Sequence, residues 1–298
     1  MGGPVLISPA NFPATAAGGG SLQKTDEKGW LQLGTGVRAV LSRLQTMTTL
    51  YPRNFPSMNR YNLGGWSGLV SPFCPIANPR ALIEFSCATA ASQTPFHVDR
   101  HKRLYCARHP LAPKVRICVK HYRCAELLMP SVKTVLRHFH ARKSFLSAAL
   151  LPRLGISTPH PLALLQKWRY GLPVECFFLT AELDCPDTLD VWMRRRVQSM
   201  PDQDISFFFR GLGRFVGQLH RAGVYHGALW SSIVACDRPR KYQFHLLDLD
   251  SLRYVGWISP WERRKQISRM MESLVQNGAL QKDVRDFALS YVEFLKDE

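Results

Sequence analysis

The chain has 298 residues, of which 46% are hydrophobic and 11% aromatic. This composition excludes collagen-like and intrinsically disordered proteins, and the length is sufficient for one large domain or two lobes that each bury a core. The charge is strongly basic, because 39 lysine and arginine residues outnumber 22 acidic residues and give a formal net charge of +17. This excess predicts an anionic partner: a phosphorylated substrate, acidic lipid headgroups or nucleic acid.

The positive charge is concentrated in one segment. Between Arg100 and Lys143 there are twelve lysine or arginine residues and a single acidic residue, Glu126. A solvated positive face explains this segment as well as a dedicated binding groove does, so both interpretations stay open.

Cysteine usage and hydropathy bear on the compartment. The eight cysteines form no CxxC pair and no cluster at zinc spacing, so we expect thiols in a reducing environment. No apolar run approaches the roughly 20 residues that span a bilayer, and residues 1–20 lack the pattern of a secretory signal. The sequence therefore predicts a cytoplasmic protein, soluble or peripherally attached to a membrane.

Residues 1–92 are rich in turn-forming residues. They include Gly18–Gly20, Gly64–Gly65 and repeated prolines, with little sustained periodicity. We expect a weakly ordered N-terminal extension over this range.

Residues 93–182 are predicted to form a small β-rich lobe. The runs 103–108 and 115–122 predict a hairpin, and strict alternation in the second run sends Lys120 to the face opposite Val119. A helix over 131–151 and two strands, 162–168 and 174–180, follow.

Residues 183–298 are predicted to form a mainly helical lobe. The clearest helix covers 204–221, where Phe208, Leu212, Phe215 and Leu219 recur at spacings of four, three and four. The other expected elements are helices over 188–197, 261–275 and 282–295 and a strand over 244–249. This order predicts an α+β, two-lobed protein-kinase-like fold.

Two short motifs carry the chemistry of this half. They are His226-Gly227-Ala228-Leu229 and, nineteen residues later, Asp248-Leu249-Asp250. In kinase-fold enzymes a loop of the first kind holds the carboxylate that accepts the hydroxyl proton, and a later aspartate holds the metal. Here an alanine, Ala228, stands where that first carboxylate is expected.

Four landmarks together resemble a known family. They are the segments 119–122 (Val-Lys-His-Tyr), 155–159 (Gly-Ile-Ser-Thr-Pro), 220–227 (His-Arg-Ala-Gly-Val-Tyr-His-Gly) and 246–250 (Leu-Leu-Asp-Leu-Asp). In this order and spacing they look like the bacterial lipopolysaccharide kinase family, which phosphorylates Kdo or heptose sugars of the lipid A core. The resemblance covers the chain from about residue 96 to its end.

The resemblance implies ATP and Mg²⁺ as cofactors and gives several residues a role. Lys120 would contact the α- and β-phosphates, and Asp248 and Asp250 would hold Mg²⁺. His226 would support the catalytic loop structurally rather than transfer a proton. A hinge at Thr180, Glu182 and Leu183 would bind adenine through its backbone. The plainer alternatives are a solvated strand lysine, a loop-capping aspartate and an ordinary linker.

The sequence departs from the family pattern at four points. Ala228 replaces the catalytic aspartate, and the metal-binding asparagine expected five residues later is Ile233, with Ser232 the nearest polar substitute. No acidic residue occurs between Glu126 and Glu175, so Lys120 is expected to lack a helix glutamate. Residues 95–102 contain no glycine to admit phosphates.

Three hypotheses follow. The first is a kinase-fold protein whose catalysis is impaired and which acts by binding. The second is an active but atypical lipopolysaccharide core kinase, in which Asp248 and Asp250 carry the metal. The third is a basic module for nucleic acid or anionic membrane, of which nucleic acid is disfavoured because no recognised binding motif occurs.

The expected partners are an anionic lipopolysaccharide precursor, the surface of the inner membrane, where the protein would attach peripherally, or a partner protein. Trp257 and Trp261 beside Arg263–Lys265 could lie at a headgroup layer. We expect instead that these two tryptophans are buried in the core and that the neighbouring basic residues form a solvated face.

Overall fold

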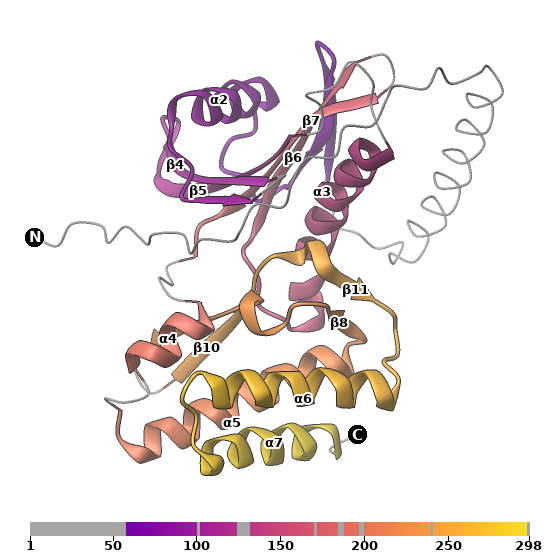
Figure 1. Cartoon of the computed structure of the whole chain (residues 1–298). Coiled ribbons are helices and arrows are strands. Elements are labelled where there is room, and N and C mark those ends of the chain that lie inside the picture. Colours follow the sequence, from indigo (N-terminus) through magenta and orange to yellow (C-terminus); the bar gives the residue numbers. More distant parts are fainter. Residues whose placement is uncertain are drawn as a thin grey trace, which may run out of the picture. The chain divides into compact units, whose positions relative to one another are not determined.

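The computed structural model describes residues 58–99, 102–123, 132–169, 172–183, 188–196, 200–238 and 241–296. Its first half forms a seven-stranded antiparallel sheet (Figure 1). The order of the strands is β1-β2-β6-β7-β5-β4-β3. Their bounds are β1 Asn59–Leu63, β2 Trp66–Val70, β3 His97–Asp99, β4 Lys102–His109, β5 Ala112–Arg123, β6 Pro161–Arg169 and β7 Leu172–Ala181. The predicted hairpin, β4–β5, and the two later strands, β6 and β7, are confirmed.

Each face of the sheet is covered by a helix. On one face Val119 and Leu179 belong to the same buried cluster as Leu82 of α2 (Pro79–Ser92). On the other face Phe178 meets Phe145 of α3 (Val132–Leu150), with ring centroids 6.0 Å apart. The prediction that Lys120 lies on the face of the sheet opposite Val119 is confirmed, because Val119 is buried against α2 and Lys120 is the next residue in the strand.

The expectation of a weakly ordered extension over 1–92 is wrong for residues 58–92. Gly64 and Gly65 both have positive φ and join β1 to β2 as a two-residue hairpin turn, which is the conformation that glycine favours. Trp66 and Val70 are buried in the α2 core, and Asn78 caps α2 with Pro79 at its first position. Residues 1–57 lie outside the described residues.

The second half contains four longer helices and two small strand pairs. These elements are α4 Leu189–Arg196, α5 Asp202–Arg221, β8 Val224–His226, β9 Ile233–Arg238, β10 Lys241–Leu246, β11 Leu252–Tyr254, α6 Pro260–Gln276 and α7 Gln281–Lys296. The predicted helices are confirmed, as is the buried face of α5, on which Phe208 and Leu212 are fully buried. Strands β8, β9 and β11 were not predicted, and β10 ends at Leu246, before the Asp248 motif.

Close packing of α5 and α7 supports the loop that begins at His226. A Cβ on Gly213 of α5 would lie 2.3 Å from the Phe287 carbonyl oxygen, so only glycine permits this approach. His220 at the end of α5 contacts the Tyr291 hydroxyl at 2.7 Å and the Gln266 amide oxygen at 2.6 Å. Gln266 of α6 in turn donates to the carbonyl oxygen of His226. A buried polar chain therefore joins α5, α6 and α7 to the loop.

The expectation of thiols is wrong for Cys106, Cys118 and Cys236, which are disulfide-bonded. Cys106 of β4 and Cys118 of β5 lie directly opposite each other in the sheet and form a disulfide. Spacing along the chain did not reveal this pair, because the hairpin rather than a local motif brings the two residues together. Cys74 and Cys87 are thiols, as expected. None of the described helices is long and apolar enough to cross a bilayer.

Candidate nucleotide site

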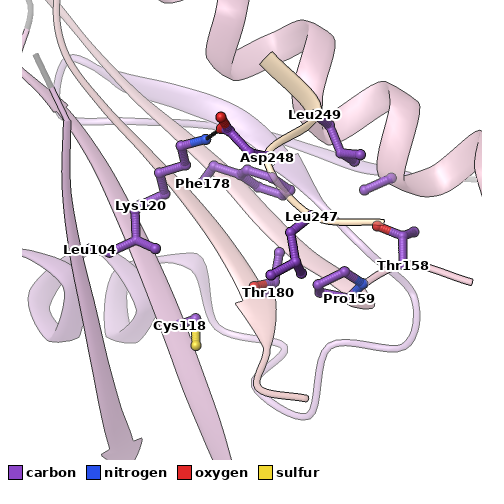
Figure 2. Close-up of a pocket in the computed structure, with 11 residues that line it drawn as sticks. Leu104, Cys118, Lys120, Thr158, Pro159, Phe178, Thr180, Leu247, Asp248 and Leu249 are labelled. Atoms are coloured by element: carbon purple, nitrogen blue, oxygen red, sulfur yellow. Dashed lines mark hydrogen bonds and ion pairs between the residues drawn. The ribbon is translucent and has the colours of Figure 1, made fainter. Parts of the chain in front are cut away.

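A small pocket lies where the β4–β5 hairpin meets the segment after β10. Its volume is about 90 Å³. Figure 2 shows side chains from two sides of this pocket, with Leu104, Cys118 and Lys120 from the hairpin and Leu247–Leu249 from the Asp248 motif. The remaining lining residues are Ala148, Thr158, Pro159, Phe178 and Thr180. The volume is well below the several hundred Å³ of ordinary small-molecule sites, so a nucleotide needs the pocket to widen.

Two lysines and two aspartates form a charge-balanced cluster at the pocket, which Lys120 and Asp248 line. Lys120 Nζ lies 2.6 Å from Asp248 Oδ1 and 2.9 Å from Asp250 Oδ2. Lys102 Nζ of β4 lies 2.8 Å from Asp250 Oδ2 and 3.3 Å from Asp248 Oδ1. The structure therefore brings together three of the residues expected at the site and adds Lys102.

Asp250 is the buried member of the pair of aspartates. Its side chain is 13% exposed, against 46% for Asp248. Its Oδ1 atom accepts hydrogen bonds from the Tyr122 hydroxyl at 2.7 Å and the Ser144 hydroxyl at 2.6 Å. As expected, α3 contributes a hydroxyl and no glutamate. Lys120 nevertheless has a carboxylate partner, because Asp250 reaches it from the segment after β10.

The charges of this cluster hold each other ionised. Burial raises the pKa of Asp250, but the charges of Lys120 and Lys102 outweigh burial and hold this pKa well below its usual range. Burial also raises the pKa of Asp248, and Lys120 is the main group that lowers it below its usual value. The pKa of Lys102 is raised because the attraction of Asp250 outweighs the effect of burial. Lys143, which donates to the Asp250 carbonyl oxygen at 3.2 Å, has a pKa lowered by burial.

Asp248 adopts a strained backbone conformation. With φ 45° and ψ 59° it is the only non-glycine residue with positive φ in the described part of the chain. Such conformations cost roughly 1–3 kcal/mol and persist where the surroundings hold them. The His226 ring lies 3.0 Å from the Asp248 carbonyl oxygen through Nε2, and its Nδ1 accepts from the Ala228 amide at 3.3 Å.

His226 thus links the two motifs. It is 1% exposed, and burial lowers its pKa, so the ring is neutral at neutral pH. This placement fits the predicted supporting role of His226, which stays a prediction.

Ala228 faces a second cavity of about 190 Å³ between the loop and α6. Ser232, the candidate substitute for the metal-binding asparagine, is buried and donates its hydroxyl to the Ala228 carbonyl oxygen at 2.8 Å. Ser231 makes a similar contact at 3.3 Å. The other lining residues are Tyr225, His226, Gly227, Leu229, Trp230, Gln266, Arg269, Met270 and Ser273. None of these residues carries a carboxylate.

The predicted hinge is only partly free to bind adenine. Thr180 lines the pocket. The Glu182 amide donates to the Arg116 carbonyl oxygen at 2.9 Å, and its carboxylate pairs with the Arg116 guanidinium at 2.9 Å. Leu183, the last residue described before 188, is half-buried. The Glu182 backbone amide is therefore occupied in this arrangement.

Comparison with known proteins decides the family. The model of the "Lipopolysaccharide kinase (Kdo/WaaP) family" matches residues 126–291, more than half of the chain. The chain belongs to the lipopolysaccharide kinase (Kdo/WaaP) family. A search of curated proteins finds no match.

The fold agrees with that of a solved WaaP structure, described as "WaaP in complex with acyl carrier protein". The two share 19% sequence identity and a TM-score of 0.54, and the alignment covers 74% of this chain and 91% of the other. The two-lobed, kinase-like α+β architecture expected from the sequence is thereby confirmed.

The lysines of the site lie outside the segment that matches the Kdo/WaaP family. Lys102 and Lys120 both precede residue 126, and only the three-dimensional structure joins them to Asp248 and Asp250. Sequence reasoning missed Lys102 and Tyr122. Tyr122 carried a signal, because it lies two residues after Lys120 in a strand and so must face the same side.

Proposed function

We propose that this Kdo/WaaP family protein binds the phosphates of a nucleotide at Lys120 and Lys102 and transfers phosphate slowly or not at all. The observation that carries the proposal is the Ala228 loop. The side chain of Ala228 is a methyl group, and none of the residues that line the adjoining cavity carries a carboxylate. General-base assistance contributes about 10²- to 10⁴-fold in rate, which this loop cannot supply.

Binding is supported by the lysine pair. The Lys120 ammonium group lies in the lining of a pocket that also contains the apolar side chains of Leu104, Phe178 and Leu249, and Lys102 contacts the same two carboxylates as Lys120. Phosphate oxygens could replace the Asp248 carboxylate as partners of the lysines, because Asp248 is the more exposed aspartate. Thr180 and Leu183 would line the adenine end, whereas the Glu182 amide first has to leave Arg116.

Asp248 and Asp250 offer the hard oxygen ligands that Mg²⁺ prefers, and the ion would neutralise charge on the phosphates. Each carboxylate already accepts from lysine ammonium groups. The donor set fits Mg²⁺, but the ion has to compete with two fixed positive charges. We therefore expect nucleotide binding that depends weakly on Mg²⁺.

Titration of the full chain with ATP, followed by thermal unfolding with Mg²⁺ and with EDTA, tests this proposal. The expected result is a modest rise in Tm that persists in EDTA and is lost in Lys120→Met. Lys114→Met, an exposed lysine of the same hairpin, is the matched control. Strong stabilisation that requires Mg²⁺ would contradict the proposal.

A second candidate function is an active, atypical lipopolysaccharide core kinase. The observation that favours it is the Asp250 contact, because Lys120 keeps a carboxylate partner at 2.9 Å despite the missing helix glutamate. In this case the acceptor hydroxyl attacks without a dedicated base, which a loose transition state allows. The two candidates differ in whether phosphate transfer depends on Asp248.

Our proposals for the acceptor and the partners are based on the family and on the solved neighbour. The acceptor that we propose for the cavity beside Ala228 is an anionic, sugar-containing lipopolysaccharide precursor, because Arg269 supplies positive charge there. The solved WaaP structure contains acyl carrier protein, so a carrier protein is the partner class to test first. We propose that the β-rich lobe covers residues 58–182 and the helical lobe residues 183–298. We also propose that the protein is cytoplasmic.

A further inference from the structure

The turn between β11 and α6 exposes large apolar side chains. Trp257 is 65% exposed, Trp261 67% and Val255 45%. The expectation that the tryptophans belong to the core is wrong. Grouped exposed apolar side chains on an otherwise charged surface mark a site of interaction.

The backbone fixes this exposure. Ile258, between the two tryptophans, is fully buried and anchors the turn. The Val255 amide donates to the Gly223 carbonyl oxygen at 2.9 Å, and the Ser259 hydroxyl accepts from the Glu262 amide at 3.2 Å at the start of α6. The tryptophans are therefore held outward on a supported turn.

Basic side chains surround the tryptophans. Arg264 and Lys265 are exposed, and the Lys265 ammonium group lies 4.8 Å from the centre of the Trp261 ring. The acidic residue of this turn, Glu262, lies 3.5 Å from the Arg253 guanidinium and is thereby neutralised. The turn is apolar and net positive, which complements an anionic and amphipathic surface.

The basic residues continue towards the second cavity. Trp261, Lys265 and Arg269 lie four residues apart on α6, so they share one side of the helix over about 12 Å. Arg269 lines the cavity that Ala228 also lines. The exposed turn and the cavity are therefore connected by one stripe of α6.

We propose that Val255, Trp257, Trp261, Arg264 and Lys265 form a docking edge that inserts its tryptophans into an anionic lipid surface and presents the cavity beside Ala228 to lipid headgroups. A membrane fits better than an acidic protein. The tryptophans line neither cavity, and a protruding aromatic pair flanked by cations is typical of shallow insertion between headgroups. The proposal concerns docking and does not depend on nucleotide binding or phosphate transfer.

Sedimentation of the full chain with vesicles tests the docking edge. We expect binding to mixed phosphatidylcholine–phosphatidylglycerol vesicles and little binding to phosphatidylcholine alone. Trp257→Ser/Trp261→Ser should weaken binding by about tenfold or more. Arg264→Glu/Lys265→Glu should weaken it by at least about 25-fold, because each basic residue near an anionic surface contributes about fivefold.

Matched control variants show whether a loss of vesicle binding comes from the docking edge itself or from any change in net charge or in exposed aromatic surface. Phe73→Ser removes another aromatic side chain that is 68% exposed, and Arg108→Glu/Lys114→Glu makes the same change in net charge on the β4–β5 hairpin. Both controls should bind vesicles like the unmodified chain, and all variants should keep their Tm and their response to ATP. Equal losses in edge and control variants would overturn the proposal, as would binding to an acidic protein without binding to vesicles.

Discussion

In the proposed function, Ala228 is the residue that limits phosphate transfer most directly. Replacing it with aspartate puts a carboxylate beside the cavity at the position of the missing base. We expect Ala228→Asp to raise phosphate transfer by about 10²-fold, the lower end of what a general base contributes, because Ser232 remains committed to a backbone carbonyl. The measurement is transfer of labelled phosphate from ATP, with Ala228→Asn as the uncharged control. Equal rates in the two variants would show that loss of the base is not what limits transfer.

Asp248 and Asp250 have different surroundings and should respond differently to neutralisation. Asp250→Asn leaves Lys102 and Lys120 without their buried partner, which typically costs about 3–5 kcal/mol of unfolding free energy. Asp248→Asn removes a more exposed partner and should cost about 1 kcal/mol. Urea unfolding of both variants measures the difference. A larger loss in Asp248→Asn would contradict the view that Asp250 is the anchor of the cluster.

Helix α3 provides a test of the same anchor at the scale of an element. Ser144 touches Asp250, so a glutamate at position 144 can return a carboxylate from the helix that supplies it in the usual kinase arrangement. We expect Ser144→Glu to restore part of the unfolding free energy lost in Asp250→Asn. Ser144→Gln in the same background controls for size. No advantage of glutamate over glutamine would mean that α3 does not reach Lys120.

The buried junction of α5, α6 and α7 should make stability depend on pH. Burial lowers the pKa of His220 to about 4, whereas the same ring titrates near 6.5 in the unfolded chain. Between these values the unfolded chain binds more protons, so the unfolding free energy falls as pH drops from about 6.5 to 4, by about 3 kcal/mol for this ring. His220→Gln should flatten the slope without removing it, because burial also lowers the pKa of His226. An unchanged slope in urea unfolding across this window would contradict the assignment.

Helices and the main hairpin could be predicted from periodicity, because α5 and β5 each bury one regular face. The β1–β2 hairpin could not. Gly64 and Gly65 indicate loops and tight turns equally well, and burial of Trp66 depends on β6, about one hundred residues away. The same limit applies to the site. Lys120 and Asp248 belong to short motifs, but the contacts of Lys102 and Asp250 exist only when two distant segments meet.

At the scale of the whole molecule, the net charge of +17 predicted an anionic partner without saying which one. In the described residues, basic side chains occur in three kinds of surroundings. Lys102 and Lys120 are neutralised by aspartates, Arg116 and Arg253 pair with glutamates, and Arg264 and Lys265 stay exposed beside the tryptophans. The segment from Arg100 to Lys143 is therefore not one uniform basic face.

We propose that the chain keeps a kinase-family nucleotide site without effective phosphate transfer. The most direct test is transfer of labelled phosphate from ATP, with Mg²⁺, to dephosphorylated lipopolysaccharide by the unmodified chain and by Asp248→Ala. We predict the same background level in both, while the unmodified chain still responds to ATP in thermal unfolding. Transfer by the unmodified chain far above that of Asp248→Ala would contradict the claim and establish an active enzyme.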